Sequence, residues 1–113
     1  MEEKSIFEKI LNQEIESDFV FEDGEIFAIN DINPVAPVHI LIIPKKRINT
    51  INDLTEEDTL LIGKMVIVAK NIAKEMGIDE SGYRILWNTN KDAMQTVFHI
   101  HLHLIGGTEL KAI

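Results

Sequence analysis

Cysteine is absent from this chain, and proline and glycine are scarce, with 3 and 6 residues among 113. Without a thiol, disulfide bonds, thiolate nucleophiles and cysteine-ligated zinc are all excluded. The sequence also has no internal repeat, no low-complexity tract and no flexible linker rich in Pro, Gly or Ser. We therefore expect residues 1–113 to form a single compact domain.

Basic residues are in the minority, because 11 Lys and Arg face 19 Asp and Glu, for a formal net charge of -8. A surface of this sign repels polyanions, so we expect neither nucleic acid nor an anionic membrane as a partner. No apolar run approaches the roughly 18 residues that a membrane span needs. The opening MEEKSIFEKI is charged where a signal peptide would be apolar, so we expect a cytoplasmic protein.

The first half of the chain predicts one short helix and three strands. Ser5-Ile6-Phe7-Glu8 has the form of a capping box, which predicts a helix that ends near Asn12. Asp23-Gly24 suits a type I′ hairpin turn between two strands. The expected strands are 19–22, 25–30 and the apolar run 39–44. The basic cluster 45–47 that follows is interpreted as a solvated turn.

The second half predicts one long helix and two further strands, at 83–88 and 97–105. Thr55 and the acidic residues after it favour a helix start, and Gly77 favours a left-handed end. The apolar positions on the main helix stripe are Leu61, Met65, Val68, Ile72 and Met76. The positions that widen the stripe are Ile62, Val66, Ala69 and Ala73, and from this width we expect a homodimer. The predicted fold class is α+β, with about five mostly antiparallel strands.

Three of the four histidines alternate within the segment FHIHLHLIGG, residues 98–107. Successive side chains of a strand point to opposite faces, so His99, His101 and His103 are expected to share one face. The residues expected to face the core are Phe98, Ile100, Leu102 and Leu104. Single histidines on a sheet are commonly structural, but three in strict alternation indicate a functional site.

Metal binding is one chemistry open to these histidines, since zinc takes imidazole nitrogen as a ligand. At about 3.3 Å per residue, however, His99 and His103 begin roughly 13 Å apart, so all three cannot easily reach one ion. Two of them together with His39 would converge more easily. We expect no required metal or cofactor, and we keep a zinc site as the alternative.

Nucleophilic catalysis is the other chemistry, because histidine is largely neutral at physiological pH. One imidazole can attack phosphorus while the others bind the oxyanion and donate a proton to the leaving group. The sequence contains no phosphate-binding P-loop and no acidic magnesium cluster.

The segment 99–105 fits the motif His-φ-His-φ-His-φ-φ, where φ is apolar, and so resembles the histidine triad (HIT) superfamily of nucleotide hydrolases and transferases. Further segments resemble its Hint branch, the histidine triad nucleotide-binding proteins. These segments are SIFEKI, DINPVAPVHILIIPKKRI, GYRILWN and QTVFHIHLHLIGG. The resemblance implies a half-barrel sheet with two helices, a homodimer, and hydrolysis of adenosine 5′-phosphoramidates or aminoacyl adenylates.

The resemblance also implies roles for the histidines. His101 would attack the α-phosphorus and form a nucleotidyl-histidine intermediate, and His103 would contact the phosphate and assist the leaving group. His99 would orient the site within a network that includes His39. Thr96, where the branch usually has Ser, would place a hydroxyl near the leaving nitrogen.

The nucleotide would be an AMP-type purine nucleotide, bound by a second set of residues. Asp31, followed by Ile32, stands where the family holds the ribose hydroxyls, and Asn88 stands near the ribose and phosphate. Gln95 and Thr96 would bring donors to the phosphate. The apolar slot for the base would be formed by Ile6, Phe7, Ile10 and Ile29.

Two features depart from the Hint pattern. Met94 stands where the pattern favours glycine, and a larger side chain there would redirect the loop or narrow the leaving-group side. The C-terminal segment 109–113 is shorter than the tail of some relatives. Two alternatives to a phosphoramidase therefore stay open: a dinucleoside polyphosphate hydrolase or nucleotidyl transferase, and a regulatory nucleotide-binding module with little turnover.

Overall fold

The computed structural model describes residues 3–113, so the first two residues of the expected domain lie outside it. Five strands form one antiparallel sheet in the order β1-β2-β3-β5-β4. The strands are β1 (Phe19–Glu22), β2 (Ile26–Asn30), β3 (Val38–Pro44), β4 (Tyr83–Leu86) and β5 (Leu102–Gly106). The helices are α1 (Ile6–Leu11) and α2 (Thr59–Glu75), with short 3-10 helices at Ile51–Asp53, Glu56–Asp58 and Lys91–Ala93. The predicted α+β class, with one long and one short helix, is confirmed.

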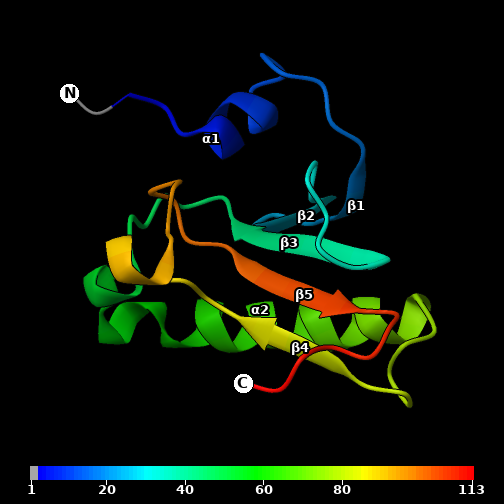
Figure 1. The fold of residues 1–113 in the computed structure, drawn as a ribbon. Coiled ribbons are helices and arrows are strands. Elements are labelled where there is room, and N and C mark those ends of the chain that lie inside the picture. Colours follow the sequence, from blue (N-terminus) through cyan, green and yellow to red (C-terminus); the bar gives the residue numbers. More distant parts are fainter. Residues whose placement is uncertain (1–2) are drawn as a thin grey trace.

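The two helices cover opposite faces of the sheet (Figure 1). Alternate residues of the central strands therefore enter two separate apolar clusters. On the α2 face the cluster includes Ile26, Ala28, Ile40, Ile42, Leu102, Leu104, Met65 and Ile72. On the α1 face it consists of Phe7, Ile10, Phe27, Ile29, Leu41 and Ile43. Burial of both faces explains why the middle of β3 is continuously apolar.

Helix α1 begins as its sequence predicts. The Ser5 hydroxyl accepts a hydrogen bond from Glu8 N–H, and the Glu8 carboxylate accepts one from Ser5 N–H. This reciprocal capping box satisfies two backbone donors at the helix start. Because Phe7 and Ile10 are buried against the sheet, the cap also fixes where α1 lies over β2 and β3.

Helix α2 ends as predicted, with Gly77 in a left-handed conformation at φ +73°. Its start differs slightly, because a 3-10 turn at Glu56–Asp58 precedes the α-helix. Ala69 and Ala73, expected to widen the stripe toward a second subunit, are fully buried in the core of this chain. The exposed apolar residues of α2 are instead Leu60 and Ile67. Within the described residues, no helix is both long and apolar enough to span a bilayer.

The β1–β2 hairpin forms as expected, but its turn is not type I′. Neither Asp23 nor Gly24 has a positive φ, as that turn requires. The Asp23 carboxylate instead accepts hydrogen bonds from the N–H groups of Glu25 and Ile26, both at 2.8 Å. This side-chain turn satisfies the backbone without left-handed residues, so the dipeptide prediction was wrong.

Candidate active site

The histidine segment is only partly a strand. The sequence predicted a strand over 97–105, whereas β5 begins at Leu102 and includes only His103 of the three alternating histidines. Strand β4 likewise ends at Leu86, so Asn88 lies beyond it. The prediction that one strand carries all three histidines was therefore wrong.

Residues 98–100 are held by the loop after β3 instead of by a sheet partner. The N–H of Ile100 donates to the carbonyl of Ile48 at 2.8 Å. Arg47 donates through Nε to the carbonyl of Phe98 at 3.0 Å. Leu102 and Leu104 reach the core as predicted, but Phe98 is 43% exposed, contrary to prediction.

His99 is fully buried, and both of its ring nitrogens are bonded. Nε2 lies 2.7 Å from the carbonyl oxygen of Pro44, which can only accept, so Nε2 carries the proton. Nδ1 lies 2.7 Å from the hydroxyl of Ser5, which donates to it. Burial lowers the pKa of His99 below its usual value. His99 is therefore a neutral residue in one fixed tautomer.

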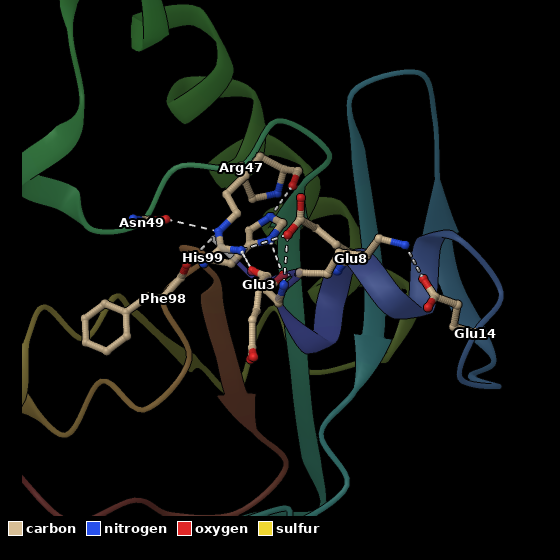
Figure 2. A network of polar contacts seen from close by, with 10 residues as sticks. Glu3, Glu8, Glu14, Arg47, Asn49, Phe98 and His99 are labelled. Atoms are coloured by element: carbon tan, nitrogen blue, oxygen red, sulfur yellow. Dashed lines mark hydrogen bonds and ion pairs between the residues drawn. The ribbon is translucent and has the colours of Figure 1, made fainter. Parts of the chain in front are cut away.

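An ion pair between Arg47 and Glu8 lies beside this histidine, near the start of α1 (Figure 2). Arg47 donates through one NH1 group to the Glu8 carboxylate at 2.9 Å and to the Glu3 carbonyl at 2.6 Å. Glu8 also caps α1 through Ser5 N–H, which is the main reason that its pKa is lowered. Arg47 is thus a structural link between α1 and the segment at Phe98, and not part of a solvated turn as the sequence suggested.

His101 is oriented by the backbone of His99. Its Nδ1 lies 2.9 Å from the His99 carbonyl oxygen, so Nδ1 carries the proton and Nε2 keeps its lone pair. The ring packs edge-on against Phe7, with centroids 5.0 Å apart. Burial lowers the pKa of His101, which favours the neutral form. This geometry leaves a neutral imidazole nitrogen for chemistry.

His103 on β5 is paired with His39 on the neighbouring strand β3. The two rings meet through His39 Nε2 and His103 Nδ1 at 2.9 Å. The Asp31 carboxylate lies 3.3 Å from the same His39 nitrogen. The pKa of His103 is lowered to about 4. Burial is the largest cause, and the neighbouring His101 and His39 lower it further. The Asn88 amide nitrogen lies 3.5 Å from His103 Nε2, which places Asn88 beside this ring.

Asp31, His39 and His103 are also close enough to consider as a metal site, since one ligand atom from each lies within 4.8 Å of the others. His39 would have to offer Nε2 without its proton, which moves that proton to Nδ1. Nδ1 already accepts a hydrogen bond from Val35 N–H at 3.1 Å, and two donors would then face each other. The hydrogen bonding of His39 therefore opposes metal binding in this arrangement.

A cavity of about 340 Å³ joins these groups to the sheet face under α1. Among the residues expected at the site, its lining includes Ile6, Phe7, Ile10, Ile29, Asp31, Ile32, Asn88, Thr96, His101 and His103. One part of the lining is apolar, and the rest carries a carboxylate, an amide, a hydroxyl and two imidazoles. Such a lining suits a ligand with a flat apolar portion and a polar portion.

Gln95 is placed differently from the expectation. It is buried and does not line the cavity, and its backbone N–H donates to the Asn90 carbonyl. Its side-chain amide accepts from Asn90 N–H and donates to the carbonyls of Asn49 and Val97. Gln95 therefore holds the loop that carries Thr96, and this role was missed from the sequence.

Met94 has a left-handed backbone, with φ 61° and ψ 35°. This conformation costs little for glycine and more for any residue with a Cβ, which explains why glycine suits the position. The Met94 side chain is 75% exposed and lines the rim of the cavity with Thr96.

Two other hollows in the described surface have no histidine in their lining. One, lined by Lys46, Arg47 and Asp58 among others, is larger and more open. A second lies between the end of α1 and β1, near Phe19. The cavity under α1 has a smaller volume than either of these two hollows, but its lining joins apolar residues to two imidazoles and theirs does not.

Comparisons with known proteins agree with this geometry. The family model for the HIT domain matches residues 12–110. A purine nucleoside phosphoramidase of Escherichia coli K12 is 49% identical over 110 residues, which is 97% of this chain and 92% of that protein.

Solved structures show the same fold. A HIT family hydrolase from Legionella pneumophila is 47% identical, with a TM-score of 0.93 over 96% of each chain. A histidine triad nucleotide-binding protein from Candida albicans is 29% identical, with a TM-score of 0.80 over 97% of this chain and 86% of that one. The chain therefore belongs to the histidine triad (HIT) family, and within it to the Hint branch.

Proposed function

We propose that this protein hydrolyses the P–N bond of purine nucleoside 5′-phosphoramidates and releases AMP. The observation that carries the proposal is the tautomer of His101, which keeps an unprotonated Nε2 in the cavity under α1. The E. coli relative named for this activity is 49% identical over nearly the whole chain.

His101 is the nucleophile in this proposal. Its Nε2 attacks the α-phosphorus and forms a new N–P bond, and the P–N bond of the substrate breaks as the leaving nitrogen takes up a proton from solvent water and departs as an amine. Water then attacks the phosphorus and gives up a proton to the solvent, the bond to His101 breaks, and AMP is released with a neutral imidazole. The Nδ1–H bond to the His99 carbonyl stabilises the positive charge that develops on the ring during attack.

The other polar groups bind the phosphate and the leaving group. His103 is held with its pKa near 4, so it is neutral and acts as a hydrogen-bond donor to the phosphate. Thr96 lines the same cavity as His101 and His103, and in this reaction it offers its hydroxyl to the leaving nitrogen. His99 is buried behind His101 and orients it.

The nucleoside occupies the rest of the cavity. The purine lies on the apolar surface made by Ile6, Phe7, Ile10 and Ile29, with Ile32 at its exposed edge. Asp31 binds the ribose hydroxyls, and Asn88 lies between the ribose and the phosphate. An apolar slot of this kind favours a purine because its area is larger than that of a pyrimidine.

No metal or other cofactor is required in this proposal. The nucleophile is already neutral, and the hydrogen bond from Val35 N–H to His39 works against zinc. A cytoplasmic location remains a prediction.

We further propose that the whole chain acts as one HIT domain and pairs as a homodimer. Residues 5–11 precede the family match, yet Ser5 and Phe7 contact His99 and His101.

Leu60 and Ile67 lie two turns apart on α2, so they share a face, and 86% and 52% of their areas are exposed. An exposed apolar pair of this kind suits packing against a second copy.

The proposal is tested by incubating the protein with adenosine 5′-phosphoramidate in a chelating buffer and measuring AMP release. We expect turnover by the wild type and its loss in His101→Ala, with His101→Ala still binding AMP. AMP binding without turnover by the wild type would reject the enzyme and favour the regulatory module.

A further inference from the structure

The Asp31 carboxylate serves two neighbours at once. One oxygen, Oδ1, accepts a hydrogen bond from Asn33 N–H at 2.8 Å and so closes a turn after β2. The other, Oδ2, lies 3.3 Å from His39 Nε2. The side chain is 19% exposed, so this contact is largely shielded from solvent. A contact to ribose therefore does not account for the whole placement of Asp31.

His39 is held in one tautomer from both sides of its ring. Val35 N–H donates to Nδ1 at 3.1 Å, so Nδ1 must keep its lone pair and the neutral ring carries its proton on Nε2. The Asp31 carboxylate oxygen 3.3 Å from Nε2 attracts a proton on that nitrogen, so it favours the same tautomer. The His39 side chain is 4% exposed, which leaves little room for water to replace either partner.

The tautomer of His39 determines that of His103. Because His39 donates through Nε2 to His103 Nδ1 at 2.9 Å, a neutral His103 must carry its own proton on Nε2. That nitrogen faces the Asn88 side-chain amide, which must turn its oxygen, not its N–H₂ group, toward Nε2–H for the two groups to pair. The charged and titratable groups that act on His103 are His101, His39 and Asp31, and only the Asp31 charge raises its pKa.

We propose that Asp31 is a positioning residue for the reaction: through His39 it holds His103 with Nε2–H toward the phosphate, in addition to binding ribose. The inference rests on the proposed function. In chemical terms, nucleotide recognition and the orientation of the hydrogen-bond donor to the phosphate depend on the same carboxylate. Ribose hydroxyls bound to Asp31 would therefore contact the same group that fixes the His39–His103 pair.

The test combines one variant with two substrates. Asp31→Asn keeps an oxygen for Asn33 N–H, while its amide N–H₂ opposes His39 Nε2–H. Each enzyme is assayed with adenosine 5′-phosphoramidate and with its 2′,3′-dideoxy analogue, which lacks the hydroxyls. We expect kcat to fall about tenfold or more on both substrates. A higher KM on the ribose substrate alone, with the dideoxy substrate unaffected, would overturn the inference.

A pH profile separates positioning from a general structural defect. Because the Asp31 charge raises the pKa of both His101 and His103, its removal should move the acid limb of kcat to lower pH. Asp23→Asn is the matched control, since Asp23 closes a similar turn at the other end of β2. The control should change neither kcat nor the pH profile, and an identical shift in it would contradict the inference.

A measurement without turnover tests the inference independently of the enzyme assay. Long-range proton–nitrogen NMR spectra of the histidine rings should show His39 and His103 as Nε2–H tautomers in the wild type, and a mixture in Asp31→Asn. Wild-type rings in the other tautomer, or no change in the variant, would reject it. Failure of the wild type to release AMP while the spectra behave as expected would instead reject the proposed function.

Discussion

His101 donates its Nδ1–H to the carbonyl oxygen of His99 at 2.9 Å, so the backbone two residues earlier decides which nitrogen of His101 can attack. His99 is itself fixed, because Ser5 donates to its Nδ1 and Pro44 accepts from its Nε2. The orientation of the nucleophile thus depends on a helix cap and on the end of β3. Several properties of the protein should depend on this chain of contacts.

The pH dependence of the reaction should reflect histidines that are held neutral. Burial lowers the pKa of His101, and that of His103 falls to about 4. Activity that needs the neutral form is lost only as pH falls through these lowered values. We expect kcat/KM to stay level from about pH 8 down to the ordinary histidine pKa of about 6.5, and to decrease only at lower pH.

The measurement is AMP release across this range at constant ionic strength, after subtraction of uncatalysed hydrolysis at each pH. An acid limb centred at or above the ordinary histidine pKa would show that the imidazoles are not held neutral as described.

Ser5→Ala should reduce both stability and rate. The substitution removes the N-cap of α1 and leaves His99 Nδ1 buried without its donor, for a loss of about 1–3 kcal/mol in the free energy of unfolding. A less firmly held His99 should also lower kcat. Denaturant unfolding and steady-state kinetics measure the two effects.

Thr50→Ala is the control for Ser5→Ala, because Thr50 caps a 3-10 helix by the same kind of reciprocal bonding. It should lower stability without a matching loss of kcat. If Ser5→Ala had the rate of the wild type, the helix cap would have no part in orienting the nucleophile.

Met94→Gly should stabilise the protein by about 0.5–1 kcal/mol, because glycine adopts φ 61° without the strain imposed by a Cβ. Met94→Ala retains that strain and should show no such gain in the free energy of unfolding. Equal stabilisation by both variants would mean that loss of the exposed side chain, and not the backbone, is responsible.

The same pair of variants tests the leaving-group side of the cavity. Both remove the side chain at the rim, so both should raise kcat/KM for bulky amine leaving groups relative to ammonia. An unchanged ratio would show that Met94 does not restrict the leaving group.

Ile67→Glu should convert the proposed dimer to a monomer, because a carboxylate would be buried at the apolar contact on α2. Sedimentation velocity at micromolar concentration measures this change. Lys9→Glu, an exposed substitution on α1 at the opposite face of the sheet, is the control and should leave the mass unchanged. A wild type that sediments as a monomer would contradict the proposed dimer.

Local sequence signals predicted much of the fold. The capping box at Ser5, the end of α2 at Gly77 and the apolar run of β3 each depend on neighbours in the chain, and each is present. The turn at Asp23-Gly24 also depends on local chemistry, but the dipeptide permits more than one turn. Its carboxylate satisfied the backbone in another way.

The site was less predictable because its decisive contacts join distant segments. Alternation of histidines indicated the correct residues, yet it could not show that Ile48 and Arg47 replace a strand partner before β5. The buried role of Gln95 depends on Asn49, 46 residues away. The available signal for Arg47 was the basic cluster 45–47, which follows the proline that ends β3.

The proposed reaction depends on a covalent bond from His101 Nε2 to the nucleotide. It is tested most directly by mixing the protein with adenosine 5′-phosphoramidate, quenching in the first turnover, and mapping the adenylated peptide by mass spectrometry. We expect an AMP adduct on His101 that is absent from His101→Ala. An adduct on His103, or AMP release at full rate by His101→Ala, would contradict it.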